Sequence, residues 1–246
     1  MSMADNSKIE WTEATWNPVT GCDQVSPGCA HCYAKTFAER WTGVPDHPYE
    51  QGFKLRLWPE RLEQPIRWKR PRMIFVNSMS DLFHEDIEVS FIEDVFKAMG
   101  EASHHTFQIL TKRHERLAEL APQLDWHPNV WMGVSIENRR FVERADRLRE
   151  VDSAVRFISA EPLLGPLVGL DLTGIDWLIA GGESGPKHRR MDPTWVTDLR
   201  DLSVAEGVSF FFKQWGGRTS KSGGRTLEGR TWDELPSSPR PALVPA

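Results

Sequence analysis

The feature that most constrains the fold is a series of seven short apolar runs separated by helical patterns. Each run is rich in β-branched and aromatic residues, and its apolar residues are nearly continuous rather than alternating. Continuous apolar character is typical of strands that are buried on both faces of a parallel sheet. The predicted strands are Thr15–Thr20, Arg72–Ser78, Thr106–Thr111, Asn129–Ser135, Ala154–Ser159, Asp176–Gly181 and Val208–Lys213.

Amphipathic helices are predicted between these strands. Tyr33, Phe37 and Trp41 recur at every fourth position and form one apolar stripe. A second stripe lies in segment 90–100, where Gly100 is expected as the C-cap.

Two further helices are expected in the second half of the chain. One lies within residues 138–151, and the other begins after Asp192 as its N-cap and stops at Gly207. Because strands and helices alternate, they build repeated right-handed βαβ units. We therefore predict the α/β class, with parallel strands and outer helices in a closed or partly open (β/α) barrel.

A single domain is predicted over residues 1–235. Segment 43–72 is rich in Pro, Trp and basic residues and interrupts the alternation, so we interpret it as an insertion or a lid over one mouth of the barrel. The proline-rich tail, residues 236–246, is predicted to be disordered.

Charge and hydropathy narrow the class of protein. The 246 residues carry a net charge of −5, which argues against a surface devoted entirely to polyanions. No apolar run approaches the roughly 18 residues of a membrane span, and the first residues lack the apolar core of a signal peptide. We predict a cytoplasmic protein that does not bind membranes. In that reducing compartment, clustered cysteines indicate metal binding or catalysis more than crosslinks.

The three cysteines of the chain, Cys22, Cys29 and Cys32, lie within eleven residues. A closed structural zinc site needs four ligands, and the candidates for a fourth are His31, inside the gap between the last two thiols, and the more distant His84. Inert buried thiols are a second interpretation. A third is a four-iron cluster held by three thiolates, which leaves one iron open to a small molecule. S-adenosylmethionine suits that iron because its amino and carboxylate groups can chelate one metal.

Seven stretches of the chain together resemble a known family. On these stretches the sequence looks like the radical S-adenosylmethionine superfamily and, more closely, a phage-associated family with three cysteines within or beside it. The resemblance runs from Ile9 to about Trp232. The stretches are IEWTEATWNPVTGCDQVSPGCAHCYAKTFAERW (Ile9–Trp41), IFVNSMSDLFHED (Ile74–Asp86), FQILTKR (Phe107–Arg113), WMGVSIEN (Trp131–Asn138), RFISAEPLLGPL (Arg156–Leu167), WLIAGGESGP (Trp177–Pro186) and FFFKQWGG (Phe210–Gly217).

This resemblance implies a partial (β/α)6 TIM-like barrel with the cysteine loop after the first strand. It implies that Cys22, Cys29 and Cys32 ligate a [4Fe–4S] cluster and that S-adenosyl-L-methionine binds the open iron. The cosubstrate is then cleaved to a 5′-deoxyadenosyl radical, with an electron donor such as flavodoxin or ferredoxin. The spacing of the first two cysteines departs from the superfamily. The superfamily motif has three residues between them, whereas six residues separate Cys22 from Cys29 in this chain.

In a (β/α) barrel the residues just past each strand form the chemical site. By resemblance, the turn after the second strand binds the amino group of the cosubstrate and the turn after the fourth binds its ribose. Two glycines after the sixth strand would permit close backbone approach to the adenine or the substrate. Ser80 or Asp81 could equally cap a helix. The predicted cofactor-binding residues are Ser78, Ser80, Asp81, Ser135, Glu137, Asn138, Gly181 and Gly182.

Six other side chains that follow strands are candidates for substrate contact. A lysine at such a position would meet an anionic group such as phosphate, or its stem would pack over the strand end while its head group stays in solvent. The candidates are Lys112, Glu161, Glu183, Lys213, Gln214 and Trp215.

Basic clusters at 69–72, 187–190 and 218–230, together with Trp58, Trp68 and Trp215, suit a nucleic-acid or nucleotide partner. Solvated surface charge explains these clusters equally well. The sequence thus predicts a radical S-adenosylmethionine enzyme that acts on an unidentified substrate, for which a nucleic acid or nucleoside is one candidate. The alternative is a zinc- or cluster-stabilised nucleic-acid-binding accessory protein without turnover.

Overall fold

The structure, a computed structural model, describes residues 7–236. Seven strands form a parallel sheet in the order β1-β4-β5-β6-β7-β8-β9, so neighbours in the sheet follow one another along the chain. This singly wound order, with helices between strands, is the topology of a partial (β/α) barrel and confirms the predicted fold class. Residues 237–246 of the predicted disordered tail lie outside the described residues.

The chain divides into two compact units, residues 1–131 and 132–246. The single domain over residues 1–235 stays a prediction. None of the helices among residues 7–236 combines the length and the apolar character that crossing a membrane requires.

The strands of the first unit are paired in parallel, with Ala14 opposite Ile74 and Ile74 opposite Phe107. Trp16, Ile74 and Phe107 are fully buried. The indole Nε1 of Trp16 donates a hydrogen bond of 2.8 Å to the carbonyl of Arg61, which satisfies the polar atom of this core ring. These strands are β1 (Ala14–Trp16), β4 (Met73–Val76) and β5 (Thr106–Thr111).

The first predicted strand, Thr15–Thr20, is two separate strands in the structure. β1 ends at Trp16, and β2 (Val19–Thr20) pairs antiparallel with β3 (Arg56–Leu57) in a small second sheet. The change of partner falls at Pro18, which has no N–H to donate to a strand ladder. Segment 43–72 is therefore tied through β3 to the residues just before Cys22, and its role as a lid stays a prediction.

Helix α3 (Val89–Glu101) buries the predicted apolar stripe against the first unit. Gly100, the predicted C-cap, lies inside the helix, which ends at Ala102. The ring of His127 packs against this glycine, because a Cβ there would lie 2.2 Å from its Nε2. Close packing therefore explains Gly100. The other helical segments of this unit are η1 (Pro27–Cys29), α1 (Tyr33–Glu39), η2 (Pro59–Arg61), α2 (Gln64–Arg67), α4 (His114–Leu120) and η3 (Ala121–Gln123).

Helix α1 has its aromatic stripe on the outside. Tyr33, Phe37 and Trp41 are 59%, 43% and 37% exposed, whereas Ala34 and Ala38 are buried. The sequence identified this stripe, and the structure shows that the opposite, alanine-bearing face of the helix is the buried one. The two alanines present a smaller surface that lets the helix backbone approach the rest of the unit.

The sheet of the second unit confirms the predicted buried strands. Strand β6 (Val130–Ser135) is buried throughout. β7 (Val155–Ala160) pairs in parallel with β8 (Trp177–Gly181), which pairs with β9 (Ser209–Gln214). Phe157, Trp177, Phe210 and Phe212 are among the fully buried side chains. Continuous apolar character along these strands is therefore explained by burial on both faces.

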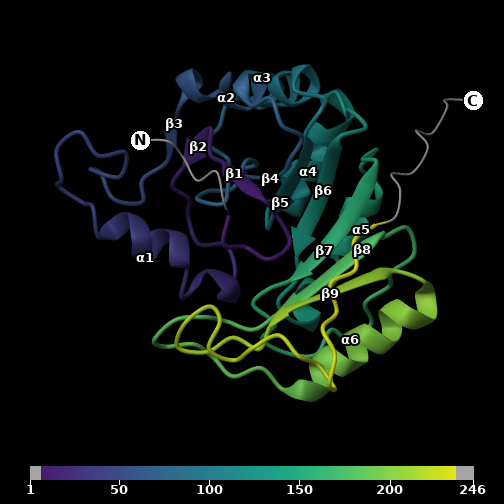
Figure 1. Cartoon of the computed structure of the whole chain (residues 1–246). Coiled ribbons are helices and arrows are strands. Elements are labelled where there is room, and N and C mark those ends of the chain that lie inside the picture. Colours follow the sequence, from purple (N-terminus) through teal and green to yellow (C-terminus); the bar gives the residue numbers. More distant parts are fainter. Residues whose placement is uncertain (1–6, 237–246) are drawn as a thin grey trace, which may run out of the picture. The chain divides into compact units, whose positions relative to one another are not determined.

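Helix α6 (Pro193–Glu206) covers β8 and β9 (Figure 1). Its predicted caps are confirmed: the Asp192 carboxylate accepts a 2.9 Å hydrogen bond from the Thr194 N–H, and Gly207 ends the helix at φ 69°. The helix predicted within 138–151 is shorter and consists of η4 (Arg139–Phe141) followed by α5 (Arg144–Arg149).

Two glycines of the first unit provide a matched test of backbone packing. Gly21 and Gly43 both have positive φ, +85° and +78°. A Cβ on Gly21 would lie 2.1 Å from the Lys54 carbonyl oxygen, whereas a Cβ on Gly43 would meet nothing within 4 Å. Alanine at either position costs about 1 kcal/mol for the positive φ, but only Gly21→Ala adds a clash of about 1–3 kcal/mol.

We expect Gly21→Ala to lower the melting temperature by roughly 5 °C more than Gly43→Ala. Thermal denaturation followed by circular dichroism measures the difference. Equal shifts for the two variants would contradict the close approach of Gly21 and Lys54.

Candidate functional site

The cysteine loop of the first unit starts from a fixed point. Directly before Cys22, the N–H of Gly21 donates a 3.0 Å hydrogen bond to the carbonyl of Met79. The hydroxyl of Ser80 donates a 2.9 Å hydrogen bond to the carbonyl of Val19. Two elements far apart in the sequence, the loop entry and the turn 77–81 after β4, are thus joined at the first cysteine.

The rest of the loop is held by its own backbone. The Cys29 N–H donates to the carbonyl of Ser26 over 2.9 Å, and the side-chain amide of Gln24 donates to the carbonyl of Cys29 over 3.0 Å. Cys32 occupies the N-cap position of α1, and the next residue, Tyr33, donates its hydroxyl to the carbonyl of Ser78. Both ends of the loop are therefore attached to the same turn.

All three thiols are free and partly exposed. Cys22 and Cys29 are close enough for the charge of the Cys29 thiolate to influence the titration of Cys22.

Asn17 is a residue that the sequence analysis missed. Its side-chain oxygen accepts hydrogen bonds from the Ser78 hydroxyl at 3.2 Å and from the Met79 N–H at 3.0 Å. It thereby shapes the turn that holds the cysteine loop. Its position directly after β1 is the signal that would have found it, because residues just past strand ends were the rule for choosing candidates.

Asp81 joins the ends of two strands. One carboxylate oxygen accepts hydrogen bonds from the Thr111 hydroxyl at 2.7 Å and the Phe83 N–H at 3.0 Å, and the other accepts from the Lys112 N–H at 3.1 Å. The side chain is buried. Since a carboxylate offers about four acceptor directions, these three bonds give Asp81 a structural role and leave room for about one further donor.

The thiol of Cys22 is electrostatically unusual. Burial and then the neighbouring carboxylate of Asp81 raise the pKa of Cys22 to about 12, while the guanidinium of Arg113 acts in the opposite direction. Arg113 also pairs with Glu85. Sequence analysis missed Arg113, although it lies two residues past β5. The loop thus presents a neutral thiol flanked by one anionic and one cationic side chain.

The two histidines considered as fourth zinc ligands are placed differently. The Nδ1 of His84 accepts the Asp86 N–H at 3.2 Å, so its proton lies on Nε2, which donates to Asp23 at 3.2 Å. Both nitrogens of His84 are therefore engaged. His31 is exposed. The structure does not bring either histidine to the thiols as a ligand.

The donor set of the cysteine loop consists of three thiols. Within residues 7–236, no three His, Cys, Asp or Glu side chains converge on a point where one metal ion would sit. A cluster makes a different demand, since each thiolate binds a different iron of the cube. The structure places three uncrosslinked thiols on one anchored loop, with the guanidinium of Arg113 beside the first of them.

In the second unit, Glu137 lies after β6 and is fully buried. Its carboxylate accepts a 3.0 Å hydrogen bond from Arg144, whose Nη1 also donates to the carbonyl of Ser135 over 2.6 Å. Asn138 caps η4 by accepting the Arg140 N–H at 3.0 Å. The three residues predicted to bind ribose are therefore held in one turn by an ion pair and a cap.

Glu161 and Lys213, two substrate candidates, are brought together as an ion pair of 3.0 Å. Glu161 follows β7, Lys213 lies on β9, and β8 runs between them. A Cβ on Gly181, at the end of β8, would lie 2.6 Å from the Glu161 carboxylate. Because Gly181 has no side chain, the side chains of Glu161 and Lys213 can meet across the middle strand. The packing of this ion pair therefore explains the glycine.

The remaining candidates lie along the loops after β8 and β9. A Cβ on Gly182 would lie 2.1 Å from the carbonyl oxygen of Trp215. Gln214 donates a 2.6 Å hydrogen bond to the Ser184 hydroxyl, and its buried Oε1 has no partner. Glu183 is nearly buried and pairs with both the backbone N–H and the guanidinium of Arg189. Glu183 thus shapes its own loop.

A family model described as "Protein of unknown function (DUF5131)" matches residues 6–236. The chain belongs to this family. The description does not mention phages, so the phage association stays a prediction. No curated protein matches the chain.

Solved structures of spore photoproduct lyase are similar to this DUF5131 chain. One, in complex with dinucleoside spore photoproduct, has a TM-score of 0.48 and 14% identity and covers 80% of this chain and 62% of that chain. A mutant with bound AdoMet and the same dinucleoside has a TM-score of 0.46 and 15% identity, with 81% and 62% covered. The DUF5131 chain thus spans less than two thirds of the length of these structures.

The raised pKa of Cys22 predicts slow alkylation of the metal-free protein. At pH 8, raising a thiol pKa from 9.0 to about 12 lowers the thiolate fraction about 1000-fold. A more basic thiolate is also more nucleophilic, so the alkylation rate falls by less than the thiolate fraction does. We expect Cys22 to react with iodoacetamide about 40-fold more slowly than a thiol of pKa 9.0 and equal exposure. Time-resolved peptide mass spectrometry measures this rate, and early modification of Cys22 would contradict the environment described.

The buried pair Glu137–Arg144 predicts a large effect on stability. Glu137→Gln leaves Arg144 buried without a counter-charge, which costs about 3–5 kcal/mol. The matched control is Glu150→Gln, which removes the exposed pair with Arg147, where both side chains are 52% exposed; it should change stability by less than about 1 kcal/mol. Urea denaturation of both variants measures the difference, and similar midpoints would disprove the burial of the pair.

Proposed function

We propose that this member of the DUF5131 family is a radical S-adenosylmethionine enzyme in which Cys22, Cys29 and Cys32 ligate a [4Fe–4S] cluster. The observation that carries this proposal is the anchoring of three free thiols on one loop, with both loop ends attached to the turn 77–81 after β4. A loop of six residues between the first two cysteines gives the chain enough length to surround a cube. With the cluster bound and an electron from a donor such as flavodoxin or ferredoxin, S-adenosylmethionine would be cleaved to methionine and a 5′-deoxyadenosyl radical that takes hydrogen from the substrate.

The turn that anchors the loop would bind the amino end of the cosubstrate. Ser78 and Ser80 already use their hydroxyl protons on Asn17 and Val19, so their oxygens remain acceptors. Asp81 retains about one acceptor direction. Acceptors of this kind suit an ammonium group. Arg113, beside Cys22, would offset part of the negative charge of the three thiolates.

The residues of the second unit would act on the nucleoside part and on the substrate. We propose that Glu137 positions the turn 135–138, since its carboxylate is engaged by Arg144, while Ser135 and Asn138 present that turn to the ribose. Glu161 and Lys213 form a partly exposed pair that would contact a substrate with both a donor and an acceptor.

The anaerobically purified protein should be brown, contain about four irons per chain and release 5′-deoxyadenosine from S-adenosylmethionine in the presence of dithionite. Cys29→Ser should lose the iron and keep its far-ultraviolet circular dichroism, because the core lies in the strands. Iron analysis, absorption spectra and chromatography of the nucleoside product measure these outcomes. Global unfolding of Cys29→Ser would contradict this separation.

His31→Ala serves as the control for the zinc alternative. His31 is exposed and lies between two cysteines, so its removal should leave the iron content at about four per chain. A colourless protein with one tightly held zinc would favour the accessory protein without turnover. Loss of that zinc in His31→Ala would identify the histidine as its ligand.

A further inference from the structure

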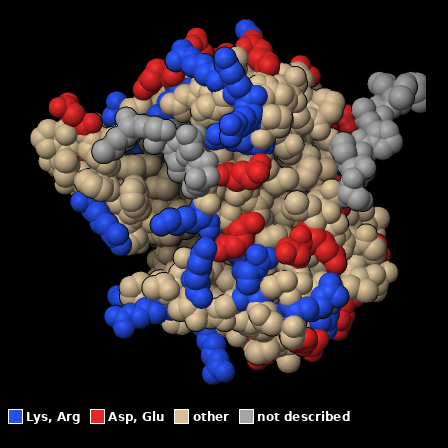
Figure 2. All heavy atoms as spheres, in the orientation of Figure 1, with Lys and Arg blue, Asp and Glu red and all other residues tan. Residues whose placement is uncertain are grey.

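The two loops that follow β8 and β9 in the second unit are strongly basic. Residues 185–190 (GPKHRR) and 215–225 (WGGRTSKSGGR) contain six lysines and arginines and no acidic residue, in a chain whose net charge is −5. Figure 2 shows blue side chains gathered at the lower left of the molecule, where Figure 1 draws these loops. Segregation of positive charge on an acidic protein indicates a surface for an anionic ligand.

The backbones of these loops lie side by side. The Gly185 N–H donates to the carbonyl of Gly217 over 2.9 Å, the Gly217 N–H donates to the carbonyl of Glu183 over 3.0 Å, and the Trp215 N–H donates to the carbonyl of Gly224 over 3.0 Å. A Cβ on Gly216 would lie 2.3 Å from the Glu183 carbonyl oxygen. The basic side chains therefore project from a base that is fixed by backbone hydrogen bonds and close packing.

The six cations are not equivalent. Arg189 is paired with Glu183, which raises the pKa of Arg189 through hydrogen bonding and holds the first loop in shape. Arg225 stacks over the ring of Phe211 with partly buried nitrogens. The exposed cations are Lys187, Arg190, Arg218 and Lys221. Asp192 is the acidic neighbour of Arg190, and its carboxylate already caps α6.

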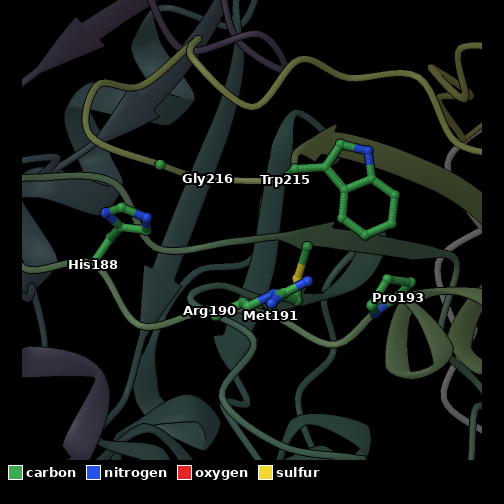
Figure 3. Close-up of a pocket in the computed structure, with 7 residues that line it drawn as sticks. His188, Arg190, Met191, Pro193, Trp215 and Gly216 are labelled. Atoms are coloured by element: carbon green, nitrogen blue, oxygen red, sulfur yellow. The ribbon is translucent and has the colours of Figure 1, made fainter.

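A hollow of about 200 Å³ lies between the loops. Figure 3 shows the indole of Trp215 facing Met191 and Pro193 across it, with His188 at the other end near Gly216. The Trp215 Nε1 donates to the carbonyl of Thr226 over 2.8 Å, which fixes the orientation of the ring. A hollow of this size is below the range of pockets that hold whole cofactors, but it suits one flat ring.

We propose that these loops bind single-stranded nucleic acid, with one base against Trp215 in the hollow and the phosphates on Lys187, Arg190, Arg218 and Lys221. The pocket offers an aromatic face for one base, which every base can stack against. The cations continue beyond the pocket, so they match a chain of phosphates rather than a single nucleotide. This inference goes beyond the cluster chemistry because all its residues belong to the second unit.

The test uses the full chain and a short fluorescent oligodeoxythymidine, with anisotropy measured at several salt concentrations. Four phosphate contacts predict a slope of about −2.8 in a plot of log affinity against log salt. Arg190→Glu with Lys221→Glu should weaken binding roughly tenfold or more and reduce the slope by about 1.4. The matched control is Lys97→Glu with Lys8→Glu, which makes the same change in net charge at exposed positions of the first unit outside the basic clusters and should bind as the wild type.

The stacking is tested separately by Trp215→Leu and Trp215→Phe. Loss of the ring should weaken binding roughly 5- to 100-fold, whereas phenylalanine should restore most of it. If Trp215→Leu fails to fold by circular dichroism, the charge variants and the phenylalanine variant still decide the proposal.

Binding by the Arg190/Lys221 variant at the wild-type level would overturn the proposal, as would an absence of binding by the wild type at low salt. Competition by thymidine monophosphate as strong as by the oligonucleotide would overturn the single-stranded ligand in favour of a free nucleotide. Cys22→Ser should keep oligonucleotide binding while it loses iron. Loss of iron binding in the wild type would leave the oligonucleotide result unchanged, so the two proposals fail independently.

Discussion

The carboxylate of Asp81 links the ends of β4 and β5 and lies beside the first thiol of the cysteine loop. It accepts hydrogen bonds from Thr111, Phe83 and Lys112, so its negative charge is held in a fixed place. That charge and burial make the Cys22 thiolate unfavourable. The Cys22 thiol is therefore held in its neutral form.

The turn that contains Asp81 has a second function in the architecture. Asn17, Ser78 and Ser80 connect it to β1 and to the residues before Cys22, and Tyr33 connects it to the end of the loop. A surface loop of this kind would otherwise be mobile. Because both loop ends are attached to one turn, the spacing between Cys22 and Cys32 is governed by backbone contacts rather than by a disulfide.

The strands were predictable because burial on both faces requires continuous apolar runs, and β5 has the predicted bounds. The break between β1 and β2 after Trp16 was not predictable from the sequence, because it depends on a partner strand at Arg56–Leu57 far along the chain. The buried face of α1 was not predictable for a related reason: helical periodicity identifies one face, but it does not show whether that face or the alanine face is buried. Candidate residues were chosen by their position after strands, and this rule selected Glu161 and Lys213 separately, without showing that the two side chains meet. Their direct pairing, and the engagement of Glu137 and Glu183 by Arg144 and Arg189, depends on contacts that no sequence spacing encodes.

These ion pairs also explain which charges remain for ligands. In the second unit, Glu137 and Glu183 each neutralise one arginine inside a turn, so neither carboxylate opposes an anion at the surface. Segments 185–190 and 215–225 of the loops after β8 and β9 contain no acidic residue, although the chain as a whole is acidic. The cysteine loop is likewise complete within the first unit, since its anchors, Asp81 and Arg113 all precede residue 131. The contacts that fix the cysteine loop and those that fix the basic loops after β8 and β9 therefore form separate sets, and a change in one set leaves the other in place.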